Sequence, residues 1–87
     1  MAELIFEYVG VVTRRSDGAR FRARAYGARR DDGTWEGWLE FTPAGGAEGA
    51  RTLRTGQETS QPDRQALAYW ASGLEEIYLE GALGRAR

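Results

Sequence analysis

Three arginines at every second position, Arg20, Arg22 and Arg24, are the residues of this chain best placed to do chemistry. Side chains that alternate along a strand share one face, so these guanidinium groups would line one side of a sheet. Tyr26 continues the same face, and Trp38 is expected beside it on the next strand. Arginines that track phosphates, next to aromatic rings that stack on bases, are typical of a surface that binds single-stranded nucleic acid.

Two acids weaken that interpretation. Glu36 and Glu40 are expected on the same face as cross-strand partners of Arg22 and Arg24, whose charges they would neutralise. The face would then be a half-solvated sheet surface on which arginine stems shield the two aromatic rings. The signature of the RNA-recognition motif is also absent. The five residues therefore form a candidate binding face, with nucleic acid as the less favoured ligand.

The chain has no histidine, cysteine or lysine, and all 12 of its basic residues are arginine. Proton transfer near neutral pH, attack by a thiolate and Schiff-base chemistry each lose their usual side chain. The common zinc, copper and iron–sulfur sites lose their ligands too. The sequence thus predicts a protein that is not an enzyme and has no catalytic, cofactor or metal site. Catalysis by carboxylates is left open.

The carboxylates show no convergent pattern. Glu36 and Glu40 lie four residues apart, about 13 Å along a strand, which is too far for a retaining glycosidase pair or a single metal ion. Glu75, Glu76 and Glu80 cluster in the sequence, but nothing makes their oxygens converge. We interpret them as a solvated acidic surface.

Two Asp-Gly turns divide the first half of the chain into an antiparallel meander. Strand-type composition runs over residues 3–14, 20–29 and 35–42, with turns at residues 16–18 and 31–33. Residues 43–50 are too rich in glycine for a strand and predict a flexible connection. Residues 51–59 can form a fourth strand, which is expected to be short or at an edge.

The hydrophobic pattern selects a three-residue loop, residues 31–33, for the second hairpin. This loop pairs Tyr26 with Trp38 and separates apolar from charged side chains, whereas a two-residue turn would mix them on both faces. The apolar face then carries Phe21, Ala23, Ala25, Trp35, Leu39 and Phe41.

The same register places Gly27 opposite Gly37 and leaves a notch on the apolar face. The notch could admit a ligand or an aromatic ring, but space for a core side chain such as Trp70 is the simpler interpretation. Neither glycine begins a nucleotide-binding glycine motif.

One helix is predicted over residues 62–72. Ser60 and Asp63 resemble a capping box, Pro62 suits the first turn, and Gly73 is placed to end the helix. An apolar stripe at helical spacing would pack on the sheet; its members are Leu67, Trp70, Ala71 and Leu74.

Residues 76–83 fit a short strand or a second short helix, and the alternation of Ile77 and Leu79 favours the strand. Tyr69 and Tyr78 can line an interface or build the core, and residues 57–59 can tie the start of the helix to the sheet. We favour the structural roles. The fold class is therefore α+β: an antiparallel meander of about four strands, with one C-terminal helix (62–72) packed on one face and a fifth short strand as an option after it.

Size and charge limit the remaining possibilities. The 87 residues can bury one modest core, so residues 1–87 are predicted to be a single domain. Residues 1–30 hold seven arginines against three acids and residues 31–87 five against ten, and we expect the two halves to attract each other in the fold. No stretch approaches the roughly 20 apolar residues that span a bilayer, and no signal peptide or disulfide framework is present. A cytoplasmic protein without membrane contact is predicted.

The segment Trp35-x-Gly37-Trp38-Leu39-Glu40-Phe41, with the blocks at residues 55–62 and 69–83, resembles a group of short, stand-alone bacterial proteins of uncharacterised function. The resemblance covers residues 34–83. It implies a bacterial, self-contained, single-domain protein and supplies no activity, ligand or site.

The missing catalytic side chains and an expected free sheet edge favour a non-enzymatic protein-interaction module or homodimer. A protein partner or a second copy would be its ligand, and no cofactor is predicted. The alternative is single-stranded nucleic-acid binding through the candidate face, Arg20, Arg22, Arg24, Tyr26 and Trp38.

Overall fold

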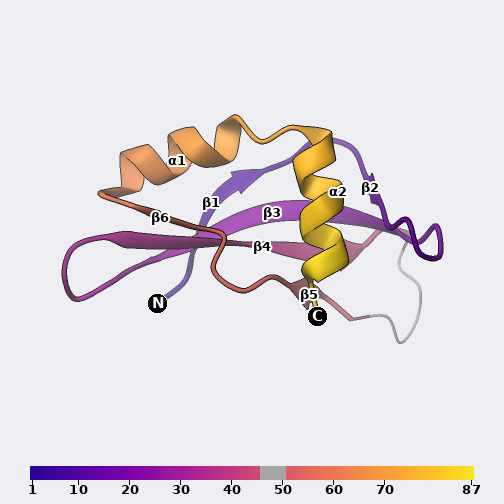
Figure 1. Ribbon diagram of the computed structural model, residues 1–87, viewed down its shortest axis with the longest axis horizontal. Coiled ribbons are helices and arrows are strands. Elements are labelled where there is room, and N and C mark those ends of the chain that lie inside the picture. Colours follow the sequence, from indigo (N-terminus) through magenta and orange to yellow (C-terminus); the bar gives the residue numbers. More distant parts are fainter. Residues whose placement is uncertain (46–50) are drawn as a thin grey trace.

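The computed structural model describes residues 1–45 and 51–87 and contains a sheet with two helices on one side (Figure 1). The strands are β1 (Glu3–Glu7), β2 (Val12–Thr13), β3 (Arg20–Arg29), β4 (Trp35–Pro43), β5 (Leu53–Arg54) and β6 (Thr59–Gln61), and the helices are α1 (Arg64–Ser72) and α2 (Glu76–Arg85). This arrangement confirms the predicted α+β class. In these ranges no helix is both long and apolar enough to cross a membrane.

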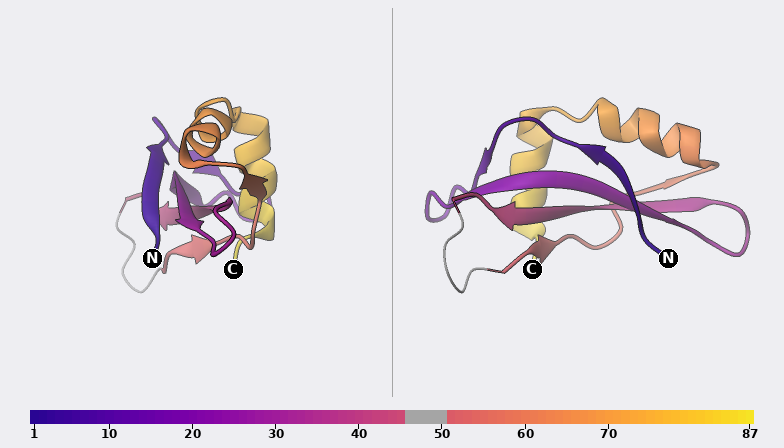
Figure 2. Two further views of the ribbon diagram at one scale, coloured as in Figure 1. Left: turned by 90° about the vertical axis from the view of Figure 1, so that its left-hand side faces the viewer. Right: turned by 180° about the vertical axis from the view of Figure 1, so that it is seen from behind.

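The sheet is the predicted antiparallel meander, with each outer row divided into two short strands. The strands β1 and β2 follow one another along β3, and β5 and β6 lie along β4 (Figure 2). The continuous strand predicted for residues 3–14 is interrupted between β1 and β2, where Gly10 has a φ of +84°. Of the connection predicted for residues 43–50, Pro43 belongs to β4, and residues 46–50 lie outside the described part of the chain.

The central hairpin has the register that the hydrophobic pattern predicts. Tyr26 pairs with Trp38, and the Arg30 N–H donates to the Thr34 carbonyl oxygen across the three-residue loop at 2.7 Å. Gly33 has a φ of +88°, a left-handed conformation that glycine adopts without steric cost. Because the loop sets the pairing, it also decides which side chains of β3 and β4 face the helices.

Leu67 of α1 fills the notch between Gly27 and Gly37. A methyl group added at Gly37 would lie 2.6 Å from Leu67 Cδ1, and one at Gly27 would lie closer still to Cδ2. Leu67 is 0% exposed, whereas Trp70 is half-buried at the margin of the core. A core side chain therefore occupies the notch as expected, but the choice of Trp70 is wrong. The branched end of a leucine is narrow enough to lie between two glycines, and an indole is not.

The first helix begins at Arg64 rather than at residue 62, because Asp63 and not Ser60 is its N-cap. Asp63 Oδ1 accepts a hydrogen bond from the Ala66 N–H at 2.8 Å, while Ser60 pairs with β4 as part of β6. Gly73 ends the helix as predicted, and its N–H donates to carbonyl oxygens of the last turn.

Residues 76–85 form a helix, so the strand favoured for residues 76–83 is wrong. Ile77, on which the alternation depended, is 74% exposed. The buried residues Leu79, Ala82 and Leu83 instead follow helical spacing and pack on the sheet. The edge of β5 is taken by the C-terminus, where Arg87 and Arg54 exchange two backbone hydrogen bonds of 3.0 Å.

Candidate binding face

The outer face of the sheet is the face opposite α1 and α2 (Figures 1 and 2). The register and the burial alternation of β3 and β4 place all five residues of the predicted binding face on it. Strand pairing adds neighbours from the outer rows. Its side chains include Leu4, Glu7, Arg20, Arg22, Arg24, Tyr26, Glu36, Trp38, Glu40, Thr42 and Arg54.

Leu4, Tyr26 and Trp38 form an apolar row across β1, β3 and β4. The rings of Tyr26 and Trp38 are nearly parallel, with centroids 6.5 Å apart and an angle of 17° between their planes. Leu4 is 46% exposed, whereas Trp38 is only 4% exposed. The row is therefore open to solvent at β1 and closed at β4.

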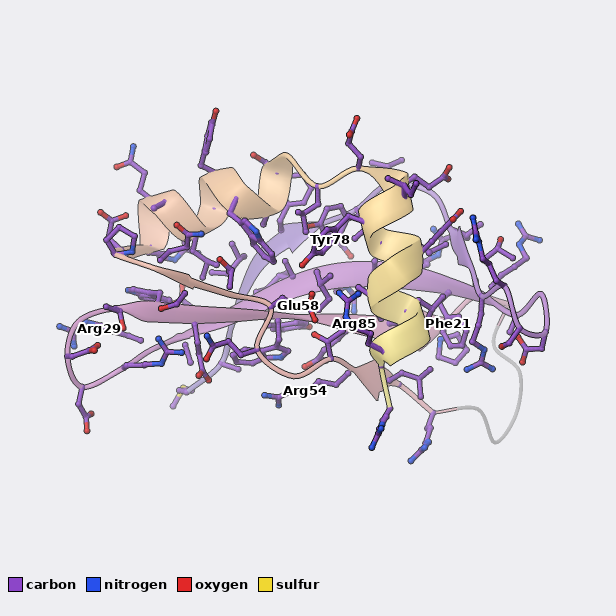
Figure 3. The ribbon with its side chains drawn as sticks, viewed as in Figure 1. Phe21, Arg29, Arg54, Glu58, Tyr78 and Arg85 are labelled. Atoms are coloured by element: carbon purple, nitrogen blue, oxygen red, sulfur yellow. The ribbon has the colours of Figure 1, made fainter. Side chains whose placement is uncertain are left out.

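Arg54 of β5 covers Trp38. Its guanidinium carbon lies 4.3 Å from the centre of the indole, and the indole N–H donates to Glu40 Oε2 at 3.2 Å. Figure 3 shows Arg54 on the side of the sheet away from the helices. A cation–π contact and the arginine stem thus bury an aromatic ring that no helix covers. A base could stack on Trp38 only after Arg54 had moved aside.

Glu7, Arg24, Glu40 and Arg54 form a charged row next to the apolar row, in which acid and arginine alternate across four strands. Arg24 Nε lies 2.9 Å from Glu7 Oε2, and this hydrogen-bonded ion pair raises the pKa of Arg24. The row has no net charge, and within it Arg24 is already paired with Glu7 of β1.

Of the expected cross-strand pairs, Arg24 opposite Glu40 is confirmed and Arg22 opposite Glu36 is wrong. Arg22 lies opposite Thr42, and Glu36 Oε2 is 3.5 Å from Arg30 Nη2. Glu40 does lie opposite Arg24, but the acid that binds Arg24 comes from β1, whose pairing the sequence pattern did not specify.

Arg20 and Arg22 are exposed on the outer face, as is Arg54, which lies on Trp38. Arg22 Nη1 lies 3.5 Å from the Gly10 carbonyl oxygen, and neither Arg20 nor Arg22 forms an ion pair within residues 1–45 and 51–87. Of the three arginines predicted to bind phosphate, these two are open to an anionic group.

Both edges of the sheet are protected against pairing with another strand. The first, β1, has a bulge between Leu4 and Phe6 and an acid at each end. On the other edge, β5 has two residues and pairs with Arg87, and β6 ends at Gln61, before a proline. The free edge expected from the sequence is therefore a poor route to association.

A second polar cluster, not anticipated from the sequence, lies between α2 and the sheet (Figure 3). Glu58 Oε1 accepts hydrogen bonds from the Tyr78 hydroxyl and from Arg85 Nη2, both at 2.6 Å, and the Glu58 side chain is 9% exposed. Burial, with the nearby Glu58 carboxylate, raises the pKa of Tyr78 to about 12. Tyr78 and Arg85 lie two turns apart on α2, and Glu58 precedes them by 20 and 27 residues, so only the fold brings the carboxylate to them.

This cluster acts as a structural tie. The tie predicted for residues 57–59 is confirmed, because the Glu58 N–H donates to the Gly37 carbonyl oxygen at 2.8 Å and Thr59 pairs with Gly37 in β6, which leads into α1. The Glu58 side chain holds α2 in addition. Tyr78 belongs to this tie through its hydrogen bond to Glu58, whereas Tyr69 is 83% exposed on α1.

The acids of the described residues form no metal site, because no three of them converge. The acid Glu80 lies 3.8 Å from Arg15 beside an open surface hollow.

Comparison with protein-family models, with curated proteins and with solved structures finds no match. No relative therefore assigns a role to any residue of the outer face.

Proposed function

We propose that this chain is a non-enzymatic protein-interaction module of a bacterial cytoplasm and that the outer face of its sheet is the contact surface. One observation carries the proposal: the helices pack on one side only (Figure 1). The other side carries an apolar row that is open to solvent at Leu4, is covered at Trp38 only by Arg54, and lies beside exposed arginines.

The composition of the face supports a protein ligand. Tyrosine, tryptophan and arginine are the side chains most enriched at the energetic centres of protein interfaces, and lysine is depleted there. Here Tyr26, Trp38 and Arg54 are neighbours, and the chain has no lysine. A partner that takes over the place of Arg54 on the indole would gain a large aromatic surface.

Single-stranded nucleic acid is the second candidate, because Arg20 and Arg22 are exposed and form no ion pair within the described ranges. Two observations favour protein over nucleic acid. Arg24 is bound to Glu7, and Trp38 is covered, so one phosphate ligand and the main stacking platform are occupied.

The test uses the absence of native cysteine. Thr42→Cys places a single thiol on the outer face, and Ser72→Cys places one on exposed α1 as the matched control. Each variant carries a thiol-linked photoreactive group and is irradiated in native lysate. We expect protein adducts from position 42 that are missing from position 72. Nucleic-acid adducts would support the second candidate, and no adduct from position 42 would contradict both.

A further inference from the structure

We propose that the protein bound by the outer face is a second copy of this chain, packed face to face about a two-fold axis parallel to the strands. The inference rests on the proposed function, since it names the partner of the same surface. It is argued from the order of charges across the sheet. Because both edges are protected, a second copy would pair through the face and not by extending the sheet.

The charged row would be complementary to the same row of a second copy read in the opposite strand order. From β1 to β5 it reads Glu7, Arg24, Glu40, Arg54. A two-fold axis that runs between β3 and β4 reverses the strand order in the second copy. Glu7 then faces Arg54 of the other copy, and Arg24 faces Glu40 of the other copy. All four charges of each row meet an opposite charge.

The other rows obey the same symmetry. Each outward residue of β3 meets the residue that it pairs with on β4, taken from the other copy. Tyr26 therefore faces Trp38, and Arg22 faces Thr42. No like charges meet in any of these outward pairs, which are Arg22–Thr42, Arg24–Glu40, Tyr26–Trp38 and Ala28–Glu36. Arg20 lies beyond the Arg22–Thr42 pair.

The alternative two-fold axis, perpendicular to the strands, is unfavourable. It would place each strand over its own copy. An axis at the level of Arg22 then brings Arg20 against Arg24 of the second copy, and an axis through the charged row brings each of its four residues against the same residue of the second copy. Like-charge contacts of this kind reject wrong arrangements. Of these two orientations, the charge pattern favours the one whose axis is parallel to the strands.

The apolar row supplies contact area, and the charged row supplies register. Aligned sheets pack about 10 Å apart, a distance that large side chains such as Tyr26 and Trp38 can fill. Salt screens ion pairs between exposed side chains, so we expect a dimer that is weakened by salt.

The test is to mix two variants that are each repelled by their own copies. In Glu7→Arg, Arg54 of one copy meets an introduced arginine, and in Arg54→Glu, Glu7 meets an introduced glutamate. Each variant alone should dimerise at least about tenfold more weakly than wild type. In a one-to-one mixture both contacts are complementary again, so a heterodimer of near wild-type affinity should form. Sedimentation across a concentration series measures all three affinities.

The control is the ion pair between Arg64 and Glu3 on the helix side of the sheet, at 2.9 Å. Glu3→Arg and Arg64→Glu should leave dimerisation unchanged, alone or mixed. Thr42→Cys adds a measurement that needs no charge reversal: a short bis-maleimide should link two copies through position 42 and not through Ser72→Cys. Wild type that stays monomeric at high micromolar concentration, or mixing that restores nothing in folded variants, overturns the dimer. In that case protein adducts from position 42 would still support the interaction module with a foreign partner.

Discussion

The two faces of the central hairpin are buried by different means. Toward the helices, β3 and β4 present Gly27 and Gly37, and Leu67 of α1 lies between them without room for one more methyl group. Away from the helices, the same strands present Tyr26 and Trp38, and the cover is a single flexible side chain, Arg54. One face is closed by a helix and the other by an arginine.

The difference shows how a small sheet can be rigid on one side and adaptable on the other. A helix that fits a notch cannot be displaced without losing the core. An arginine that lies on an indole can rotate away at a cost of about 0.5–1 kcal/mol, the strength of an exposed cation–π contact. A surface of this second kind suits reversible binding.

The sharpest test of the helix-covered face is Leu67→Ala, which should lower the free energy of unfolding by about 2–5 kcal/mol, the range for buried leucines. Gly37→Ala alone should cost about 1–3 kcal/mol, because the new methyl group overpacks the notch against Leu67 and Thr59. Since both contacts are side-chain atoms, Gly37→Ala should cost much less in the Leu67→Ala background. Urea unfolding of wild type, the two single variants and the double variant gives the coupling energy between positions 37 and 67.

Tyr69→Ala on the exposed side of the same helix is the matched control and should stay within about 0.5 kcal/mol of wild type. If the losses in the free energy of unfolding for Leu67→Ala and Gly37→Ala add up in the double variant, the two residues do not share the notch.

On the same side of the sheet, the polar tie beneath α2 should contribute less than the notch. Tyr78→Phe keeps the ring and removes the hydrogen bond to Glu58, and it should cost about 1–2 kcal/mol, because Arg85 remains bound to the carboxylate. Thermal unfolding at neutral pH measures this cost. A variant as stable as wild type would mean that the cluster does not hold α2.

The pH dependence of the same variant has a definite sign. The pKa of Tyr78 is raised from 10.0 to about 12 by burial and by the Glu58 carboxylate. Between these values the unfolded chain releases the proton and the folded chain keeps it, so the free energy of unfolding falls as the pH rises from 10 to 12. Burial raises the pKa of Tyr8 in the same direction, so the informative quantity is the difference between wild type and Tyr78→Phe. We expect a shallower fall in the variant.

The smallest effect is expected on the outer face. Arg24→Ala removes an exposed ion pair with Glu7, so its stability in urea unfolding should stay close to that of wild type. A fluorescently labelled single-stranded oligonucleotide should not bind wild type even at about 20 mM salt, where screening is weak. Binding with a log–log salt slope of roughly −2, reduced by Arg24→Ala, would instead assign the face to nucleic acid.

Local chemistry determined the centre of this protein. The Asp-Gly turns and the alternation of β3 and β4 predict the hairpin, its three-residue loop and its register, because a shift by one residue would exchange the two faces. The candidate face, Arg20 to Tyr26 with Trp38, follows from the same alternation. Asp63 and Gly73 likewise mark the ends of α1 by capping, although the sequence favoured Ser60 for the start.

Only the tertiary structure decided what covers each face. Residues 76–85 are a helix because Leu79, Ala82 and Leu83 have a sheet to pack on, which a short apolar segment does not reveal by itself. The same holds for Leu67 in the notch, for Arg54 on Trp38 and for Glu58 under α2. Each of these contacts joins residues far apart in the chain, and their pairing depends on distances that exist only after the sheet and the helices have been assembled.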